Sequence, residues 1–239
     1  MNHIAVTSLV GTVAAAALVV GACAPVFAST ALTHNTSKNP HTLASVHTAA
    51  EMMTGKQEAA LTSAIARVNA AKGISASDKT TLSDRLTTEL TALKASAARV
   101  AADTTRASAS AELKTIRGTY RADRLTISQA HLIVGIDRVV SIEIPTLTAA
   151  ETKLSAALSG KETAKSTAAL QADLADLKAQ TDAARTALSG VSAKVLSATS
   201  ADSNANEAVF QSARASMKVA HTDLVKARAD RLAIHNALK

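Results

Sequence analysis

The chain has few of the residues that break helices and few that build an aromatic core. Its 239 residues include 8 glycines, 3 prolines and no tryptophan, and its aromatic side chains are Phe27, Tyr120 and Phe210. A β-sandwich or β-barrel needs turn residues at about every ten positions, so this scarcity argues against both. Alanine, leucine and long charged side chains are abundant instead, and these residues favour long helices. The sequence therefore predicts the all-α fold class.

Cysteine is also nearly absent, because Cys23 is the only one in the chain. It ends a mainly apolar stretch without charge, since no Asp, Glu, Lys or Arg occurs before Lys38. An apolar run followed by a proline and small residues is typical of an export signal. We expect residues 1–28 to be a signal peptide that is cleaved between Ala28 and Ser29. That cleavage would remove the cysteine and exclude disulfides from the mature chain.

Two other fates of this segment stay open. Residues 20–23, Val-Gly-Ala-Cys, resemble a bacterial lipobox, and cleavage before Cys23 would leave a lipid-anchored protein. Retention of the apolar run, which is about 19 residues long, would leave a membrane anchor, because that length can just span a bilayer. We expect contact with a membrane only in these two cases. All three outcomes predict a secreted or cell-envelope protein.

The rest of the chain divides by composition and by the spacing of its apolar residues. Residues 29–49 are rich in Ser, Thr, His and Asn without a periodic apolar pattern, which predicts a disordered tether. From residue 50 onward, apolar residues recur three and four positions apart, as on one face of a helix. A helical region is predicted over 50–160 and an antiparallel helical hairpin over 161–239. The expected helices cover about 52–72, 76–102, 106–124, 128–159, 161–197 and 206–238.

Local signals set these boundaries. Ser75 lies three residues before Asp78, which is the spacing of a capping box at a helix start. Residues 103–105, Asp-Thr-Thr, predict a break between helices, and residues 125–128 predict a kink or short turn. A further kink is expected near Pro145, because proline removes a backbone donor and clashes with the preceding turn.

The clearest apolar stripe lies in the first helix of the hairpin. Its steps of four and three residues make a heptad seam, which is typical of a coiled coil. Alanine in the seams lets helix axes approach closely, so we expect an elongated antiparallel bundle that also offers seams for a homo-oligomer. The stripe consists of Leu170, Leu174, Leu177, Thr181, Ala184, Leu188, Val191 and Val195.

Short motifs in the body relate the chain to other sequences. Residues 118–121 read Gly-Thr-Tyr-Arg, residues 131–133 read His-Leu-Ile, and Asp137 and Arg138 follow before the closing hairpin. Through these features the chain resembles secreted alanine-rich helical proteins of small-genome bacteria. The resemblance spans most of the body, and it implies a coiled-coil fold and export without implying an activity. Where those proteins often carry a proline after the tyrosine, residues 126–129 read Thr-Ile-Ser-Gln.

The balance of charge favours anionic partners. The formal net charge is +7 and the isoelectric point is about 9.7, so anionic polymers or lipids are attracted. One helical face concentrates cations beside Tyr120 and predicts an anion-binding surface. The alternative is a solvated face that Glu112 and Asp123 partly neutralise. The four cationic residues of this face are Lys114, Arg117, Arg121 and Arg124.

The sequence offers no pattern for a metal, cofactor or catalytic site. No two histidines lie three or four residues apart, which is the spacing that a zinc helix requires. His34, His41 and His47 would hold a metal only loosely, and we read them as solvated. Asp137 and Arg138 interrupt the most apolar segment, where we expect them to form an ion pair at a helix interface, with Arg117 or Arg121 as competing partners. We therefore expect no enzyme, no cofactor and no small-molecule substrate.

Two functional hypotheses follow. The first is an exported non-enzymatic coiled coil that acts as an envelope or extracellular structural protein and binds an unidentified protein partner. The second is a basic binder of anionic polymers, either envelope polymers or nucleic acid, which would be lipid-anchored if Cys23 is acylated. A single tyrosine on the basic face argues against base stacking, because binders of single strands use several aromatics.

Overall fold

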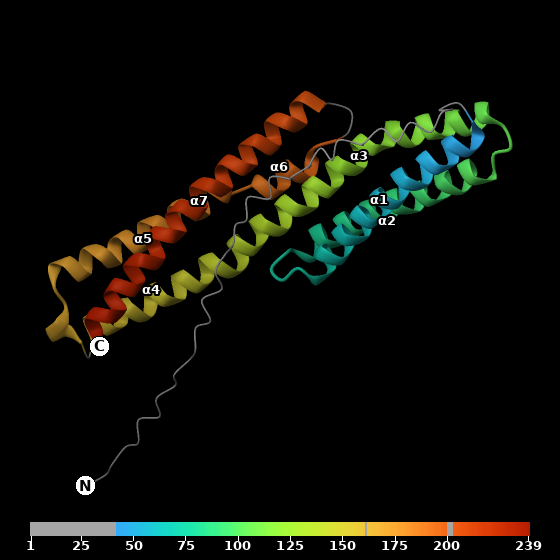
Figure 1. Cartoon of the computed structure of the whole chain (residues 1–239). Helices are drawn as coiled ribbons and strands as arrows, with labels where there is room; N and C mark the ends of the chain where they lie inside the picture. Colours follow the sequence, from blue (N-terminus) through green and yellow to red (C-terminus); the bar gives the residue numbers. More distant parts are fainter. Residues whose placement is uncertain (1–41, 161, 200–202) are drawn as a thin grey trace, which may run out of the picture. The chain divides into compact units, whose positions relative to one another are not determined.

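The computed structural model describes residues 42–160, 162–199 and 203–239. These residues form helices and no strand, which confirms the all-α fold class (Figure 1). The predicted signal peptide, Cys23 and the tether as far as residue 41 lie outside them. In chain order the α-helices are α1 (Leu43–Ala70), α2 (Ala76–Ala102), α3 (Arg106–Arg138), α4 (Ile144–Ser159), α5 (Ala168–Leu188), α6 (Val191–Ser197) and α7 (Ser203–Leu238).

Hydroxyl side chains start four of these helices. In each case the side-chain oxygen accepts the backbone N–H three residues later, which satisfies one of the free donors at a helix start. The donor–acceptor distances are 3.0 to 3.3 Å. The predicted cap at the start of α2 and the break over residues 103–105 are both confirmed. The four capping residues are Thr42, Ser75, Thr105 and Thr167.

The first helix begins earlier than the composition of the segment indicates. Residues 29–49 were expected as tether and the helix from residue 52, whereas α1 starts at Leu43. Val46 and Ala50 are buried on the same face of α1 as Leu61. Because Ser and Thr surround these apolar positions, the stripe is hard to see in the sequence, and the tether prediction is wrong from residue 43 onward.

The third helix runs unbroken through residues 125–128, where a kink or turn was expected. Its inward positions there are occupied by Thr126 and Gln129, both buried, so the helical stripe continues with polar residues. The Gln129 side chain donates to the carbonyl oxygens of Val195 and Ala198 at 2.9 and 2.7 Å, which caps the end of α6. The expected break was wrong because these polar residues were not recognised as core positions.

A wide turn of π-helix, Val139–Glu143, joins α3 to α4. The N–H of Ile144 donates to the carbonyl of Val139, five residues earlier, where an α-helix would bond to the fourth. Pro145 follows at the start of α4. Because proline lacks an N–H and crowds the preceding turn, a widened turn accommodates it. The irregularity that was expected near Pro145 therefore takes the form of a π turn.

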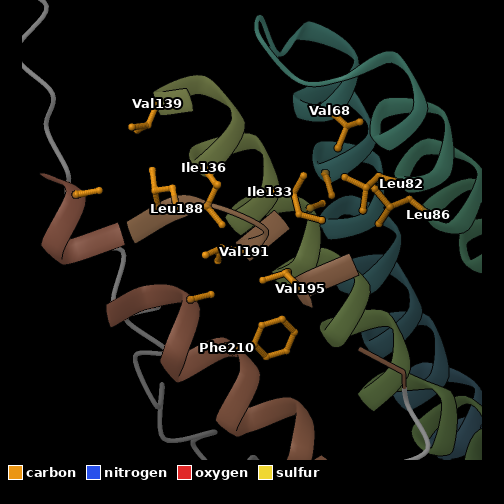
Figure 2. Packing of buried hydrophobic residues seen from close by; sticks show 14 of the residues in the cluster. Val68, Leu82, Leu86, Ile133, Ile136, Val139, Leu188, Val191, Val195 and Phe210 are labelled. Carbon is orange, nitrogen blue, oxygen red and sulfur yellow. The ribbon is translucent and has the colours of Figure 1, made fainter. Parts of the chain in front are cut away.

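The helices pack in two neighbouring groups that share α3 and α6. Helices α1, α2 and α3 contact one another, and α4 contacts α5 and α7, while α6 packs against α3 and α7. Figure 2 shows Ile133 and Ile136 of α3 lying close to Val191 and Val195 of α6. The buried apolar residues of both groups therefore form one continuous core.

The closing hairpin differs from its prediction in its first helix, because α5 begins at Ala168 and not at residue 161, and because the helix is interrupted. The Lys165 ammonium donates to the carbonyl of Leu238 at 2.8 Å, so the start of α5 lies beside the end of α7 and the two helices run antiparallel. The helix expected over 161–197 is interrupted at Gly190, which has a φ of +69°. Glycine adopts this left-handed conformation without a steric penalty. The chain turns there, and α6 leaves the line of α5.

The heptad stripe of this region is buried with one exception. Leu174 is half-buried, whereas the other seven residues of the stripe are buried. Across the helices of the described residues, none is long and apolar enough to cross a membrane.

Candidate functional site

The four predicted anion-binding residues lie together on the exposed side of α3. Lys114, Arg117, Arg121 and Arg124 are all exposed. At 100° per residue they fall within an arc of about 80°, which we call the basic face. The Arg124 guanidinium lies 5.8 Å from the ring centroid of Tyr120, a distance at which a cation is attracted to an aromatic face.

The acidic side chains of α3 turn away from the basic face. Glu112 pairs with Arg99 of α2 at 2.8 Å, and Asp123 is buried. Asp137 accepts a hydrogen bond from Ser192 at 2.6 Å. The neutralisation expected from Glu112 and Asp123 is not seen at Lys114, Arg117 or Arg121, because Glu112 pairs with Arg99 and Asp123 is buried. None of the ion pairs found among the described residues involves Lys114, Arg117 or Arg121.

A polar cluster that was not predicted lies between α1, α2 and α3. It consists of Gln57, Glu89, Asp123 and Thr126, and we call it the carboxyl cluster. The Thr126 hydroxyl donates to Glu89 Oε1 at 2.5 Å, and the Gln57 amide donates to Asp123 Oδ2. Gln57 Oε1 and Glu89 Oε2 are buried without a hydrogen-bond partner in the part of the chain that the structure describes. The cluster thus holds two carboxyl groups in an incompletely satisfied, partly desolvated site.

Burial changes the acid–base behaviour of both carboxyl groups. Burial raises the pKa of Glu89 to about 7, helped by the charge of Asp123 and opposed by the hydrogen bond from Thr126 and the charge of Arg85. Burial also raises the pKa of Asp123 to about 6. Desolvation favours the neutral form of an acid, so both groups take up protons near neutral pH. The cluster lies on the inner side of α3, and the basic face lies on its outer side.

The predicted ion pair of Asp137 and Arg138 does not form. Asp137 points towards Ser192 of α6, and the Arg138 guanidinium lies 3.6 Å from Glu143 in the π turn. Glu143 also accepts from Arg228 of α7 at 2.7 Å. Neighbouring positions on a helix point in directions about 100° apart, so each residue meets a different helix.

The histidines within the described residues do not gather. His131 is exposed on α3, and burial of part of its ring together with the charge of Arg67 lowers its pKa. Over residues 42–160, 162–199 and 203–239, no group of three or more His, Cys, Asp or Glu side chains could hold a metal ion. His34 and His41 lie outside the described residues, as do the proposed cleavage site and Cys23.

The sequence carried a partial signal for the carboxyl cluster. Asp123, Thr126, Gln129 and Ile133 follow the three-four spacing of a buried stripe, and only the last is apolar. Treating these polar residues as inward-facing would have placed Asp123 in the core. Glu89 gave no comparable signal, since its burial depends on how α2 packs on α3.

No protein-family model, curated protein or solved structure matches the chain.

Proposed function

We propose that the chain is an exported, non-enzymatic helical protein that binds an anionic polymer through the basic face of α3. The observation that carries the proposal is the separation of charge on this helix. Each of its three acidic side chains turns towards another helix, and four of its cations gather on the exposed side. Such a surface attracts polyanions more strongly than the net charge alone implies.

The dimensions of the basic face suit a linear polymer. Ten residues separate Lys114 from Arg124, which corresponds to about 15 Å along a helix. This length spans several repeating anionic groups of an extended chain. Arginine contributes a planar fork that binds phosphate or carboxylate through two hydrogen bonds, and three of the four residues are arginine.

The setting of the protein supports an envelope polymer as the partner. The export signal expected over residues 1–28 would deliver the chain to the cell surface, where anionic polymers with phosphate or carboxylate groups occur. Cys23 would add a lipid anchor if the lipobox-like residues are used.

A second candidate function rests on a different helix. Val225 and Leu232 of α7 lie one heptad apart and are 49% and 55% exposed. Two apolar side chains on one exposed stripe favour a structural coiled coil that binds a partner helix or a second copy of the chain.

A salt-dependence experiment separates the two functions. The exported protein would be titrated with fluorescently labelled polyphosphate between 50 and 200 mM salt. In a first variant, Lys114, Arg117 and Arg121 become glutamine. We expect the slope of log K against log salt to fall by about 2, since each lost phosphate contact removes roughly 0.7 from the slope for a single-stranded polymer.

The matched control removes the same charge from α7. Arg214, Lys218 and Lys226 are exposed, take part in none of the ion pairs found among the described residues, and would also become glutamine. We expect this control to bind nearly as well as the unmodified chain. Equal loss in both variants would show that net charge, and not the basic face, holds the polymer.

A further inference from the structure

The exposed side of α7 carries a second heptad seam. Three of the four most exposed large apolar side chains among the described residues belong to this helix, and they are Val219, Val225 and Leu232. Steps of four and three residues lead from Gln211 to Asn236, and every residue at these steps is exposed. At 1.5 Å per residue, this exposed seam is about 38 Å long. Between its two ends it contains Ala215, Lys218, Thr222, Val225, Ala229 and Leu232.

The opposite side of α7 is already occupied. Ala213, Ala220, Leu224 and Ala227 are buried there, and α7 contacts α4, α5 and α6. Ala220 and Ala229 are nine residues apart, which places them on opposite sides of a helix at 100° per residue. A further helix can therefore pack on the exposed seam without displacing the helices that α7 already contacts, and the alanines of the seam allow its axis to approach closely.

The charges in and beside the exposed seam are positive. In a coiled coil, the e and g positions flank the seam and determine which partner is accepted. Between Gln211 and Asn236, these positions and the seam itself contain no Asp or Glu. Three of their cations, Arg214, Lys218 and Lys226, are exposed and take part in none of the ion pairs found among the described residues.

This pattern of charge argues against a second copy of the chain as the partner. Two copies of the exposed seam would place cations opposite cations or neutral side chains, whether the helices run parallel or antiparallel, because neither copy supplies a carboxylate. A helix with Asp or Glu at its flanking positions would instead place carboxylates beside the three exposed cations. Charge complementarity therefore selects an acidic partner.

We propose that the exposed seam of α7 binds an acidic helix of a partner protein. Apolar side chains of the partner pack against Val225 and Leu232, and its carboxylates lie beside the three exposed cations. The inference rests on the second candidate function above, the binding of a partner helix, and it adds the chemistry of that partner. The basic face of α3 is a different kind of surface, since Tyr120 is the only large apolar side chain exposed on that helix.

The test titrates the exported protein with three synthetic helical peptides at physiological salt. Each peptide has about four heptads with leucine and alanine in its seam. The flanking positions are glutamate in the first peptide, glutamine in the second and lysine in the third. We expect the glutamate peptide to bind about tenfold more tightly than the glutamine peptide, because three exposed ion pairs together correspond to about this factor. The lysine peptide should bind more weakly than both.

Two variants separate the apolar part of the seam from its charges. Val225→Ser combined with Leu232→Ser changes two exposed positions, so the fold should be retained. This variant should bind the glutamate peptide at least about tenfold more weakly, because apolar contact is lost. The α7 variant in which the three exposed cations become glutamine should bind the glutamate and glutamine peptides about equally. Met52→Ser, at an exposed apolar residue of α1, is the matched control and should have no effect.

Far-ultraviolet circular dichroism establishes that each variant is folded. Equal affinities for the glutamate and lysine peptides would overturn the proposal. Self-association in sedimentation velocity that is lost in the double serine variant would identify a second copy as the occupant, which overturns the acidic partner and leaves the second candidate function in place.

The same titrations distinguish this seam from the basic face. If the glutamate peptide is lost from the α3 glutamine variant and kept by the α7 glutamine variant, then the peptide binds the basic face as a polyanion, which overturns the inference and supports the first function. If none of the three peptides binds and the protein does not self-associate, both the inference and the second candidate function are wrong.

Discussion

Replacing Glu89 with glutamine should stabilise the protein at alkaline pH. In the fold its pKa is about 7, against an ordinary value of 4.5. An acid whose pKa is raised by folding contributes its full stability below the unfolded value, and this stability is lost as the pH rises through the folded value. The unmodified protein should therefore lose stability between about pH 4.5 and pH 8. Glutamine stays neutral and keeps an oxygen that accepts from Thr126.

The magnitude follows from the difference between the two pKa values. Each pH unit of that difference corresponds to about 1.4 kcal/mol, so the whole difference would be about 3 kcal/mol. Glu89 is only partly buried and solvent screens its charge, so we expect about 1–2 kcal/mol at pH 8. Near pH 5 the two proteins should differ little, since the carboxyl group of the folded protein is then mostly protonated.

Urea unfolding at pH 5, 6, 7 and 8 measures this difference, with Glu51→Gln as a control at an exposed glutamate of α1. Asp123 keeps part of the pH dependence, because its pKa is about 6, so Glu89→Gln should reduce the slope without abolishing it. If Glu89→Gln is less stable than the unmodified protein at pH 8, then ionised Glu89 is stabilised, for example by Arg85. Our interpretation of the carboxyl cluster would then be wrong.

Leu177→Asp should lower the free energy of unfolding by about 3 kcal/mol or more, because it buries an unpaired carboxylate. Lys178→Asp changes an exposed side chain and should lower it by less than about 1 kcal/mol. Equal melting temperatures of the two variants would contradict the assignment of Leu177 to the buried heptad stripe. Gly73→Ala should lower the free energy of unfolding by about 1–3 kcal/mol, since glycine has a φ of +93° there and a new Cβ would lie 2.5 Å from a hydroxyl of the π turn; an unchanged urea midpoint would contradict it. The intact mass of the exported protein should match a chain that starts at Ser29, and a lipid-sized increment that disappears in Cys23→Ala would identify a lipoprotein instead.

The fold could be predicted wherever the inward-facing residues are apolar. Leu82, Leu86, Leu93 and Val100 follow a three-four spacing, and all four are buried on α2. The ends of α2 were predicted for the same reason, because Ser75 has a clear capping role before this stripe begins.

The prediction failed where inward-facing residues are polar, and where one glycine changes the direction of the chain. Thr126 and Gln129 are buried because partners on α2 and α6 satisfy them, and a sequence does not show which distant groups will meet. Gly190 resembles a tolerated glycine within a heptad stripe, but its left-handed backbone ends α5. The basic face was visible from spacing alone. The sequence did not show that the acidic side chains of α3 turn away from this face, because their directions depend on the packing of α3 against its neighbours.

The π turn between α3 and α4 changes the direction in which the side chains of α4 face relative to those of α3. One extra residue in a turn rotates everything that follows by about 100° relative to an uninterrupted α-helix. Before the turn the apolar side of the rod meets α1 and α2, and after it the apolar side meets α5 and α7. A deletion of one residue within Val139–Glu143 would remove the extra residue of the π turn and turn the apolar side of α4 away from its partners. The number of residues between positions 138 and 144 therefore determines which side of α4 faces α5 and α7.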